Sequence, residues 1–253
     1  MVSRVRTWID SASRVVVLTG AGISTDSGIP DFRGPQGVWT KNPGAEKTAT
    51  LSHYMASSDV RKAAWRNRVS SPAWTAEPNA GHRAIVELER RGKLHTLVTQ
   101  NIDELHQQAG THPSKVIEVH GTMRRVVCLA CGETAPMARA LERVKAGEED
   151  PPCRTCGGIL KSATISFGQA LVADDLGRAE AAASECDLLL AVGSSLSVYP
   201  IADIVPLAAA SGARVVIVNA EPTQFDRLAD AVLNGSISEI LPAICGSDEK
   251  PTT

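Results

Sequence analysis

The sequence predicts an α/β protein: a Rossmann-like parallel sheet with helices on both faces, plus a small inserted module. Short apolar runs alternate with longer helical stretches along most of the chain. The first apolar run leads into a glycine-rich turn, and four cysteines form two Cys-x-x-Cys pairs within one interruption of the alternation. A chain of 253 residues can hold one large core with a smaller module inserted into it.

The predicted strands are runs rich in β-branched and other apolar residues. Residues 15–19 are apolar almost throughout, as expected for a strand buried on both faces of a parallel sheet. Helices are predicted at the N-terminus, where the pattern is amphipathic, and at residues 80–91, 174–185 and 201–211. Because strands joined by helices run parallel, a ligand is expected at their carboxyl ends. The other strands are predicted at residues 94–99, 116–119, 188–192, 215–219 and 231–233.

Two segments interrupt this alternation and are predicted to form the small module. Residues 34–78 are polar, with a helix predicted at 57–69, and residues 123–165 contain the four paired cysteines. Residues 142–152, charged and then proline-rich, are predicted to be a loop of the cysteine-containing insert. The main domain then comprises residues 1–33, 79–122 and 166–245, and the polar tail 246–253 is expected to be disordered.

Composition narrows the partners and the location. A net charge of −2 and a pI near 6.3 do not indicate a nucleic-acid-binding surface. No apolar run approaches the roughly 18 residues that a membrane-spanning helix needs, and the N-terminus does not resemble a signal peptide. A cytoplasmic location without membrane association is therefore expected, and the oligomeric state is left open.

The four paired cysteines predict a structural zinc site. Cys128 and Cys131 are followed after 21 residues by Cys153 and Cys156, and a glycine follows each pair. Four thiolates fill a tetrahedral Zn(II) site and leave no open position for water, so the metal is expected to be structural. A redox pair or disulfides are the alternative. The remaining two cysteines, Cys186 and Cys245, lie in apolar segments and are expected to be buried core thiols.

The glycine-rich turn is only half of a dinucleotide-binding pattern. Gly20 and Gly22 can bring the backbone close to a pyrophosphate, although Gly-x-Gly alone can also be a structural turn. The third glycine of G-x-G-x-x-G would fall at Thr25, and Gly28 and Pro30 interrupt the following helix. An extended loop, residues 31–33, is then expected to fold over a bound nucleotide.

The fifteen residues from 20 to 34 resemble the signature of the sirtuins, NAD-dependent protein-lysine deacylases, and in particular their bacterial members. Four further segments resemble sirtuin motifs in family order, at residues 99–106, 119–121, 192–200 and 218–223. The similarity runs from about residue 15 to residue 242. It implies a bound NAD that is consumed, because loop 31–33 would cover a nicotinamide that is expelled rather than reduced.

The resemblance also implies catalytic roles. His120 is expected to be a general base, since a neutral imidazole titrates near pH 7 and can accept a proton from a ribose hydroxyl. Taken alone, a histidine at a strand end could simply cap the backbone. Asn101 would order the ribose or a water, Asp103 would accept a hydrogen bond from the nicotinamide amide, and Arg33 would hold the loop and a phosphate.

The residues expected to bind NAD follow from the same motifs. Phe32 would shield the ribose intermediate from water, and Ser24 would bind the pyrophosphate. For isolated Ser, Asn or Asp residues, turn capping is the default role, and only their clustering at strand ends favours a site. The full predicted set is Gly20, Ala21, Gly22, Ser24, Asp31, Phe32, Arg33, Trp39, Gln100, Asn101, Ile102, Asp103, Gly193, Ser194, Ser195, Asn219, Ala220, Glu221 and Ile237.

An acyl-lysine peptide is expected to bind as an added strand at Phe167, Gly168 and Val198. Trp65 and Arg68 occupy the positions of the Tyr-x-x-Arg pair with which some sirtuins bind acidic acyl groups. The tyrosine is replaced here, so deacetylation is predicted with other acyl groups left open. An amphipathic helix with one core and one solvated residue is the alternative for this pair.

Three departures from the family pattern stand out: Gln169 replaces a glutamate, Asp26 replaces a glutamate, and Glu104 stands where many sirtuins have glycine. Residues 33–40 resemble a branch to which acetyl, long-chain acyl or ADP-ribosyl transfer is attributed. A mono-ADP-ribosyltransferase and a non-catalytic NAD-sensing module are the alternative functions.

Overall fold

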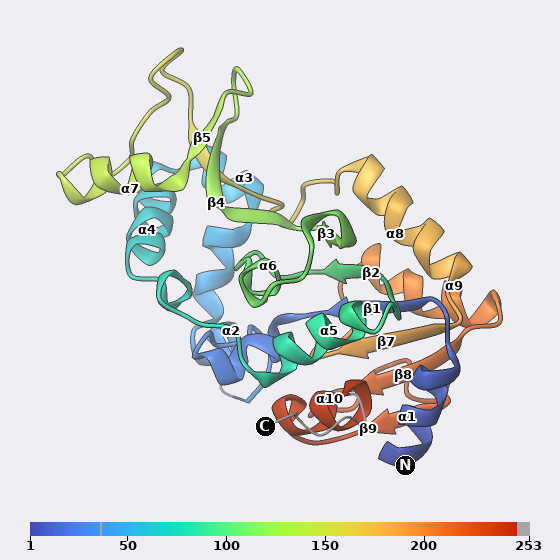
Figure 1. Ribbon diagram of the computed structural model, residues 1–253. Helices are drawn as coiled ribbons and strands as arrows, with labels where there is room; N and C mark the ends of the chain where they lie inside the picture. Colours follow the sequence, from blue (N-terminus) through green and yellow to red (C-terminus); the bar gives the residue numbers. More distant parts are fainter. Residues whose placement is uncertain (36, 247–253) are drawn as a thin grey trace.

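The structure, a computed structural model, describes residues 1–35 and 37–246 and is built on a six-stranded, fully parallel sheet (Figure 1). The strand order β3-β2-β1-β7-β8-β9 is that of a Rossmann fold, in which the chain reverses direction across the sheet between β1 and β7. The fold class predicted from the sequence is therefore confirmed. The strands are β1 (Val15–Thr19), β2 (Leu94–Thr99), β3 (Val116–Glu118), β7 (Leu188–Val192), β8 (Arg214–Val218) and β9 (Ala231–Leu233).

Four of the six strands begin and end where the sequence predicts. The strand β3 ends one residue early and β8 is shifted by one residue toward the N-terminus. Both differences lie at strand ends, where pairing with a neighbour decides the last residue. Continuous apolar character identified these strands because both faces of the sheet are covered.

Helices cover both faces of the sheet (Figure 1). Along β1, Val15 and Val17 pack into one core cluster and Val16 and Leu18 into the other, all fully buried. This alternation follows from the period of two of a β-strand. The first cluster is covered by α1 (Val2–Ser11), α5 (Ala80–Arg90) and α10 (Ile237–Cys245), and the second by α8 (Ala173–Glu185) and α9 (Ile204–Ala210).

The predicted helices are found with small changes at their ends. The one at 201–211 is divided into a 3-10 turn, η5 (Ile201–Asp203), and α9, while the one at 57–69 becomes α4 (Ser58–Val69). Helix α10 was not predicted as an element, because Pro242 inside it is a helix-breaking signal. The remaining short elements are η1 (Ala21–Ser27), α2 (Val38–Lys41), η2 (Pro43–Ala49), α3 (Leu51–Ala56), η3 (Pro72–Trp74), α6 (Leu105–Ala109) and η4 (Pro113–Lys115).

The two inserted segments share one small hydrophobic core. Trp65 of α4 packs in a cluster with Val126, Met137 and Leu160, which come from the cysteine-containing insert. This insert forms a three-stranded antiparallel sheet of β5 (Thr134–Pro136), β4 (Gly121–Cys128) and β6 (Leu160–Thr164), with helix α7 (Met137–Lys145).

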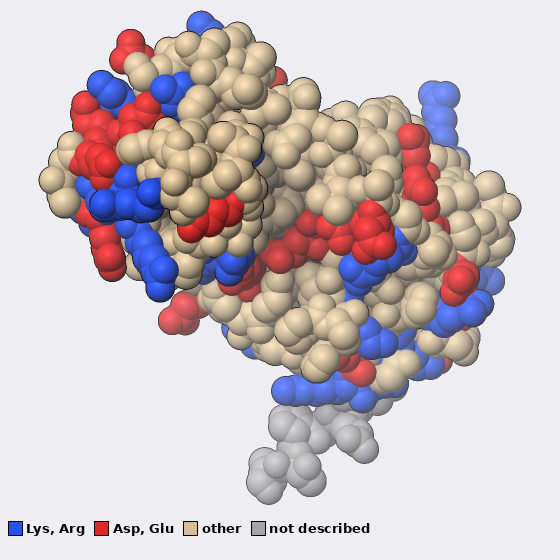
Figure 2. Space-filling model, turned by 90° about the horizontal axis from the view of Figure 1, so that it is seen from above, with Lys and Arg blue, Asp and Glu red and all other residues tan. Residues whose placement is uncertain are grey.

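Ion pairs also join the two inserts on the module surface. Arg61 pairs with Asp150 at 2.9 Å, and Lys62 pairs with Glu149 at 3.3 Å. Basic and acidic side chains alternate over this module when the molecule is viewed from above (Figure 2). The more exposed pair, Lys62 with Glu149, stabilises by only about 0–1 kcal/mol, whereas Arg61 and Asp150 are mostly buried.

The predicted loop at residues 142–152 is partly wrong. Helix α7 continues through Lys145, because Met137, Ala140 and Leu141 on its inner face are buried in the core around Trp65. The charges that suggested a loop lie on the outer face of this helix. The predicted disordered tail, apart from Gly246 at the end of α10, lies outside the described residues.

Among the residues that the structure describes, no helix combines the length and apolar character needed to cross a membrane.

Candidate functional site

The glycine-rich turn after β1 packs directly against the turn after β7. The amide of Gly22 donates to the carbonyl oxygen of Gly193 at 2.8 Å, and Gly193 has a φ of +61°. A Cβ atom at Gly20 would lie 2.7 Å from the Gly193 oxygen, and one at Gly22 would lie 2.8 Å from the Gly193 Cα. These glycines therefore permit close backbone packing at the switch point of the sheet, a reason that the sequence did not reveal.

We expect Gly22→Ala to weaken NAD binding, because the new Cβ must push the two turns apart. The expected effect is a rise in the Kd for NAD of about tenfold with a loss of about 1–3 kcal/mol of stability, the usual range for overpacking. Isothermal titration calorimetry and denaturant unfolding measure both.

Gly177 in α8 provides a matched control, since a Cβ there meets nothing within 4 Å. Gly177→Ala should stabilise the fold by up to about 1 kcal/mol without changing NAD binding. Equal NAD affinity of the Gly22→Ala variant and the wild type would contradict this explanation.

Ser24, Asn101 and Asp103 form a buried hydrogen-bonded cluster. Ser24 Oγ donates to Asp103 Oδ2 at 2.8 Å, and Asn101 Nδ2 donates to Ser24 Oγ at 3.2 Å and to the Gly20 carbonyl at 3.1 Å. The other carboxylate oxygen, Asp103 Oδ1, accepts from the amide of Leu105 at the start of α6. Burial raises the pKa of Asp103 above its ordinary value, opposed by these hydrogen bonds. Ser24 thus lies with Asn101 and Asp103, the pair that the sequence predicted to face the same way.

His120 lies in the turn between β3 and β4 with one ring nitrogen tied to the backbone. Its Nδ1 is 3.0 Å from the Gln100 carbonyl oxygen, which can only accept, so Nδ1 carries the proton. In the neutral ring Nε2 is then the basic nitrogen. Burial lowers the pKa of His120 below its usual 6.5, opposed by the hydrogen bond to Gln100. At neutral pH the side chain is therefore able to accept a proton at Nε2.

The motif after β7 is linked to the same edge of the sheet. Gln100 Nε2 donates to Ser194 Oγ at 2.9 Å, and Ser194 is buried whereas Ser195 is exposed. Beyond β8, Asn219 Nδ2 donates to the Glu221 carbonyl at 2.7 Å. The predicted NAD residues thus lie in the turns that follow β1, β2, β7 and β8, and Ile237 begins α10.

An aromatic cluster lies in the loop that follows Gly28. The rings of Phe32 and Trp39 are 4.7 Å apart, and Trp39 meets Phe167 edge-on at 5.3 Å. The guanidinium of Arg33 lies over the Trp39 ring at 4.7 Å. Phe32 nevertheless keeps 43% of its surface exposed, so loop 31–33 has an apolar face open to a ligand.

The predicted peptide-binding segment pairs with the helical insert. The amide of Phe167 donates to the Ala49 carbonyl at 2.9 Å, and its carbonyl accepts from the Leu51 amide at 3.0 Å. Gly168 follows with a φ of +81°, which favours glycine, and turns the chain toward α8. Val198 lies in the turn after β7, separate from this pairing.

Trp65 and Arg68 are neighbours within the small module, with the Arg68 guanidinium carbon 6.0 Å from the centroid of the Trp65 ring. Trp65 is 1% exposed within the small-module core. The Arg68 side chain turns to β6, where it donates to Ser162 Oγ, and burial lowers its pKa. The predicted roles of Trp65 and Arg68 in substrate binding stay predictions. Trp65 packs as the core residue of an amphipathic helix would, which is what the alternative interpretation expects of it.

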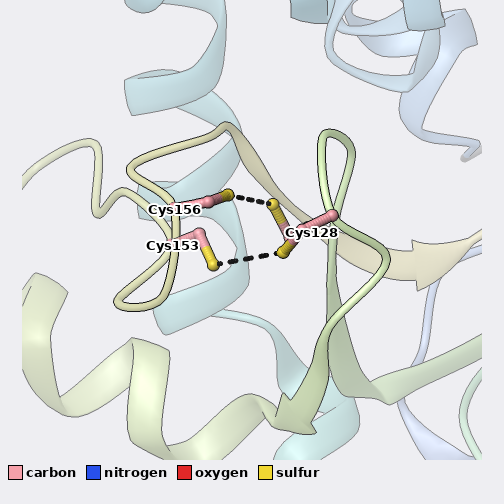
Figure 3. Close-up of side chains that lie close together, drawn as sticks. Cys128, Cys153 and Cys156 are labelled. Atoms are coloured by element: carbon pink, nitrogen blue, oxygen red, sulfur yellow. Dashed lines mark hydrogen bonds between the residues drawn. The ribbon is translucent and has the colours of Figure 1, made fainter.

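The four cysteines converge from two turns to form a cluster (Figure 3). Cys128 Sγ lies 3.5 Å from Cys156 Sγ, and Cys131 Sγ lies 3.8 Å from Cys153 Sγ. Disulfides would need sulfurs about 2.05 Å apart, whereas thiolates around tetrahedral zinc, each about 2.3 Å from the metal, lie about 3.8 Å apart. The sulfur spacing fits four thiolates around one structural zinc and does not fit disulfides.

Glycines next to this cluster permit its tight turns, while Cys128 and Cys153 are buried and Cys131 and Cys156 are exposed. The glycines that follow the two pairs, Gly132 and Gly157, have φ values of +74° and +73°, as their place after each cysteine turn predicts. A Cβ at Gly158 would lie 3.0 Å from Cys128 Sγ. Cys186 and Cys245, by contrast, are buried in the main core as predicted.

Glu104 has a backbone conformation that few residues other than glycine adopt. Its φ is +63°, a region that favours glycine, which accounts for the glycine of many sirtuins at this position. Here Thr122 Oγ1 donates to Glu104 Oε1 at 2.8 Å, and Arg124 lies 3.7 Å from Oε2.

Sequence reasoning missed two histidines behind the site. His82 and His106 are 0% and 1% exposed, with ring centroids 4.8 Å apart. Burial lowers the pKa of His82 to about 4 and that of His106 well below 6.5. His106 lies within a segment recognised as a motif, but nothing in the pattern indicated that it would be buried beside His82.

We expect these histidines to make the fold acid-sensitive. In the unfolded chain they bind protons near pH 6.5, whereas native His82 stays neutral to about pH 4. Stability is therefore full above pH 6.5 and is lost as the pH falls toward 4. His82 alone should account for about 2 kcal/mol at pH 5.

Unfolding at pH 7.5 and pH 5 measures this loss. His82→Gln keeps an acceptor for the Asn79 amide and removes the titration, so it should lose about 2 kcal/mol less than the wild type between these pH values. The exposed His112 serves as the control site. A His82→Gln variant as acid-sensitive as the His112→Gln variant would contradict the prediction.

Comparison with known proteins agrees with this geometry. The Sir2 family model matches residues 20–200. The chain is 51% identical over 230 residues to NAD-dependent protein deacetylase 2 of Streptomyces coelicolor, covering 91% of this chain and 95% of that protein. It is 42% identical to NAD-dependent protein deacylase 2 of Archaeoglobus fulgidus, covering 92% and 90%.

Solved structures give the same result. A chain described under "Structural Basis for the Mechanism and Regulation of Sir2 Enzymes" superposes with a TM-score of 0.87 at 40% identity, covering 97% of each chain. Another, described as "Sir2 bound to acetylated peptide", has a TM-score of 0.85 at 30% identity and covers 96% of this chain and 97% of that one.

Proposed function

The chain belongs to the Sir2 family, and we propose that it is an NAD-dependent protein-lysine deacetylase that releases nicotinamide and O-acetyl-ADP-ribose. The observation that carries the proposal is the ring of His120, held neutral with a basic Nε2. A mono-ADP-ribosyltransferase and a non-catalytic NAD sensor are not favoured, because the relatives reported above are named deacetylases and deacylases.

In the proposed reaction the acyl oxygen of the modified lysine forms a bond to the ribose carbon as the bond to nicotinamide breaks. His120 Nε2 then accepts a proton from a ribose hydroxyl, whose oxygen bonds to the acyl carbon. Addition of water to that carbon and cleavage of its bond to the lysine nitrogen release the free lysine, and the acetyl group stays on the ribose. The low pKa of His120 supports this role, since the ring does not need to lose a proton first at neutral pH. Arg33 and Phe32 would hold the loop over the reacting ribose.

Asn101 and Asp103 would recognise the nicotinamide end of NAD. Both are held by Ser24, which ties the loop after β2 to the turn after β1. Asp103 would accept from the nicotinamide amide and Asn101 would order the ribose or a water. The adenosine end would lie along Gly193, Asn219 and Ile237, at the carboxyl ends of β7 and β8 and the start of α10.

The peptide would add as a strand between the main domain and the small module. A Sir2 structure with an acetylated peptide supports a peptide substrate. Phe167 and Gly168 would offer one edge and Val198 the other, so that main-chain hydrogen bonds bind many sequences. The small module, residues 34–78 and 123–165, would be held in shape by zinc at the four cysteines. A cytoplasmic location is part of the same proposal.

Acetyl is the proposed acyl group. The tyrosine of the Tyr-x-x-Arg pair is replaced by Trp65, and that indole is turned into the module core rather than toward a ligand. With Trp in place of Tyr at position 65, Arg68 would bind an acyl carboxylate without the hydroxyl that completes the Tyr-x-x-Arg pair.

Incubation with NAD and acetyl-, succinyl- and myristoyl-lysine peptides, read by mass spectrometry, tests the function. We expect nicotinamide, deacetylated peptide and O-acetyl-ADP-ribose in equal amounts. Succinyl removal at a rate comparable to acetyl removal would overturn the acyl preference alone. Nicotinamide release without a deacylated peptide would indicate ADP-ribosyl transfer, and no nicotinamide release would indicate a non-catalytic module.

A further inference from the structure

His82 and His106 lie behind the proposed NAD site and take no part in the chemistry described above. They come from α5 and α6, and their rings meet at a centroid distance of 4.8 Å and an angle of 57°. Each ring has one nitrogen that is buried without a hydrogen-bond partner among the described residues: Nε2 of His82 and Nδ1 of His106. A buried polar atom left unpaired costs about 1–3 kcal/mol, so this arrangement needs a physical reason.

The proton of His82 can be located from its neighbour. The backbone amide of Asn79, which can only donate, points to His82 Nδ1 at 3.3 Å. Nδ1 must therefore be the acceptor, and in the neutral ring the proton is on Nε2. The unpartnered atom of His82 is thus a hydrogen-bond donor.

The proton of His106 follows from two threonines. Thr19 Oγ1 donates its single proton to Thr99 Oγ1 at 2.8 Å. The contact of 3.0 Å between Thr19 Oγ1 and His106 Nε2 must then be donated by the histidine. His106 therefore carries its proton on Nε2, and its unpartnered Nδ1 is an acceptor.

The two unpartnered atoms are thus of complementary type, a donor on His82 and an acceptor on His106, but no hydrogen bond joins them and the rings meet only by contact. Both rings are neutral at pH 7, because burial lowers both pKa values. Both rings must be neutral for this arrangement. A second proton on His106 would place an N–H on Nδ1 against the N–H of His82, and a second proton on His82 would remove the acceptor for the Asn79 amide.

The histidine pair is connected at each end to a segment of the predicted NAD site. At one end, Asn79 Nδ2 donates to the Ile23 carbonyl at 2.7 Å, in the glycine-rich turn. At the other end, Thr99 Oγ1 accepts from the backbone amide of Asn101 at 3.1 Å. Asn101 is also held by its side chain, where Nδ2 donates to Ser24 Oγ at 3.2 Å.

We propose that His82 and His106 form a relay, joined to each other by ring contact and continued by hydrogen bonds through Thr19 and Thr99, that positions Asn101 relative to the glycine-rich turn. They are positioning residues, because they act through Thr19 and Thr99 rather than on NAD. The relay rests on the proposed function in one respect: Asn101 is taken to face the nicotinamide ribose. The assigned proton positions on the two rings depend only on the contacts of Asn79, Thr19 and Thr99.

Long-range 1H–15N NMR of the full-length protein at pH 7 tests the relay without any activity. We expect His82 and His106 both as neutral rings with the proton on Nε2. Signals are assigned by loss in the single His82→Gln and His106→Gln variants. A proton on Nδ1 of either ring, or an imidazolium at pH 7, would overturn the proposal.

Kinetics test the positioning. Thr19→Val and His106→Leu should each lower kcat/KM for NAD by about tenfold, the effect of one buried hydrogen bond, and change KM for the peptide less than twofold. Because both act through one relay, the double variant should lose no more than either single variant. His106→Gln, whose amide can donate to Thr19, should recover most of the loss.

Additive losses, or kcat/KM for NAD retained in Thr19→Val, would overturn the proposal. A purely structural role would lower the melting temperature and leave kcat/KM of the folded fraction unchanged, so thermal unfolding is measured alongside. If His106→Leu does not fold, Thr19→Val, which preserves the side-chain shape, decides the question. A wild-type protein that neither binds nor consumes NAD would refute the proposed function, while the NMR result would still judge the relay.

Discussion

Replacing His120 with alanine is expected to abolish deacetylation while NAD binding is retained. The imidazole is the proposed base, held neutral by burial and oriented by the Gln100 carbonyl. Loss of a general base lowers a rate by about 10²–10⁴, so kcat should fall by that factor. Product formation is measured by mass spectrometry, and NAD affinity by calorimetry.

The pH profile gives an independent reading of the same residue. Only neutral His120 can accept a proton, and its pKa lies below 6.5. The wild-type rate should therefore not change between pH 7 and 8 through titration of His120, because the ring is already neutral there. It should fall only when the pH is lowered below about 6.5.

His112→Ala is the control for His120→Ala, since His112 is exposed and lies outside the predicted site. It should leave both the rate and its pH dependence unchanged. Deacetylation by His120→Ala at the wild-type rate would reject His120 as the base and leave only ligand binding at this site.

Removal of zinc is expected to have the second large effect. Cys153→Ser takes one thiolate from the cluster, and structural zinc supplies about 10–16 kcal/mol of folding free energy in small zinc modules. The strands β4 and β6 and helix α4 should then lose their common core, since Cys128 and Cys153 pack with Trp65 in it. Metal content should fall from one zinc per chain to none, and amide exchange should rise within residues 123–165.

Deacetylation should disappear with the zinc, although the metal takes no chemical part. The small module holds residues 49–51, which pair with the peptide-binding segment at Phe167. Loss of this pairing removes one edge of the proposed peptide site, while NAD should still bind the main domain.

Cys186→Ala is the matched control. Cys186 is a buried thiol of the main core, where burial raises its pKa to about 11. The variant should lose some stability and keep one zinc and full activity. Zinc retained by Cys153→Ser, or activity kept without zinc, would contradict the structural role of the metal.

Sequence reasoning succeeded where local pattern and local chemistry agree. The strand at residues 15–19 is continuously apolar because both its faces are covered, and its ends were predicted correctly. The cysteine cluster could also be predicted from local pattern, because the spacing of the four cysteines and the glycine after each pair already indicate two turns that can share one metal. The place of His120 followed from the motif, and its tautomer did not.

Prediction failed where a distant segment decides the structure. Residues 142–145 are helical because Trp65, far away in the sequence, packs on the inner face of α7. Helix α10 forms despite Pro242 because its apolar face, including Leu241 and Ile244, is buried in the core cluster that it shares with α1 and α5. Tertiary burial outweighed the local signal in both cases.

The sequence by itself thus determined the class of fold, the family resemblance, the four cysteines that cluster as zinc requires and the edge of the sheet at which the predicted site residues lie. These depend on spacing, periodicity and residue chemistry, which are local properties. Only the tertiary structure decided that Gly22 packs on Gly193, that Trp65 belongs to a core, and that His82 meets His106. Such contacts join segments far apart in the chain, and their free energy exists only when the fold brings them together.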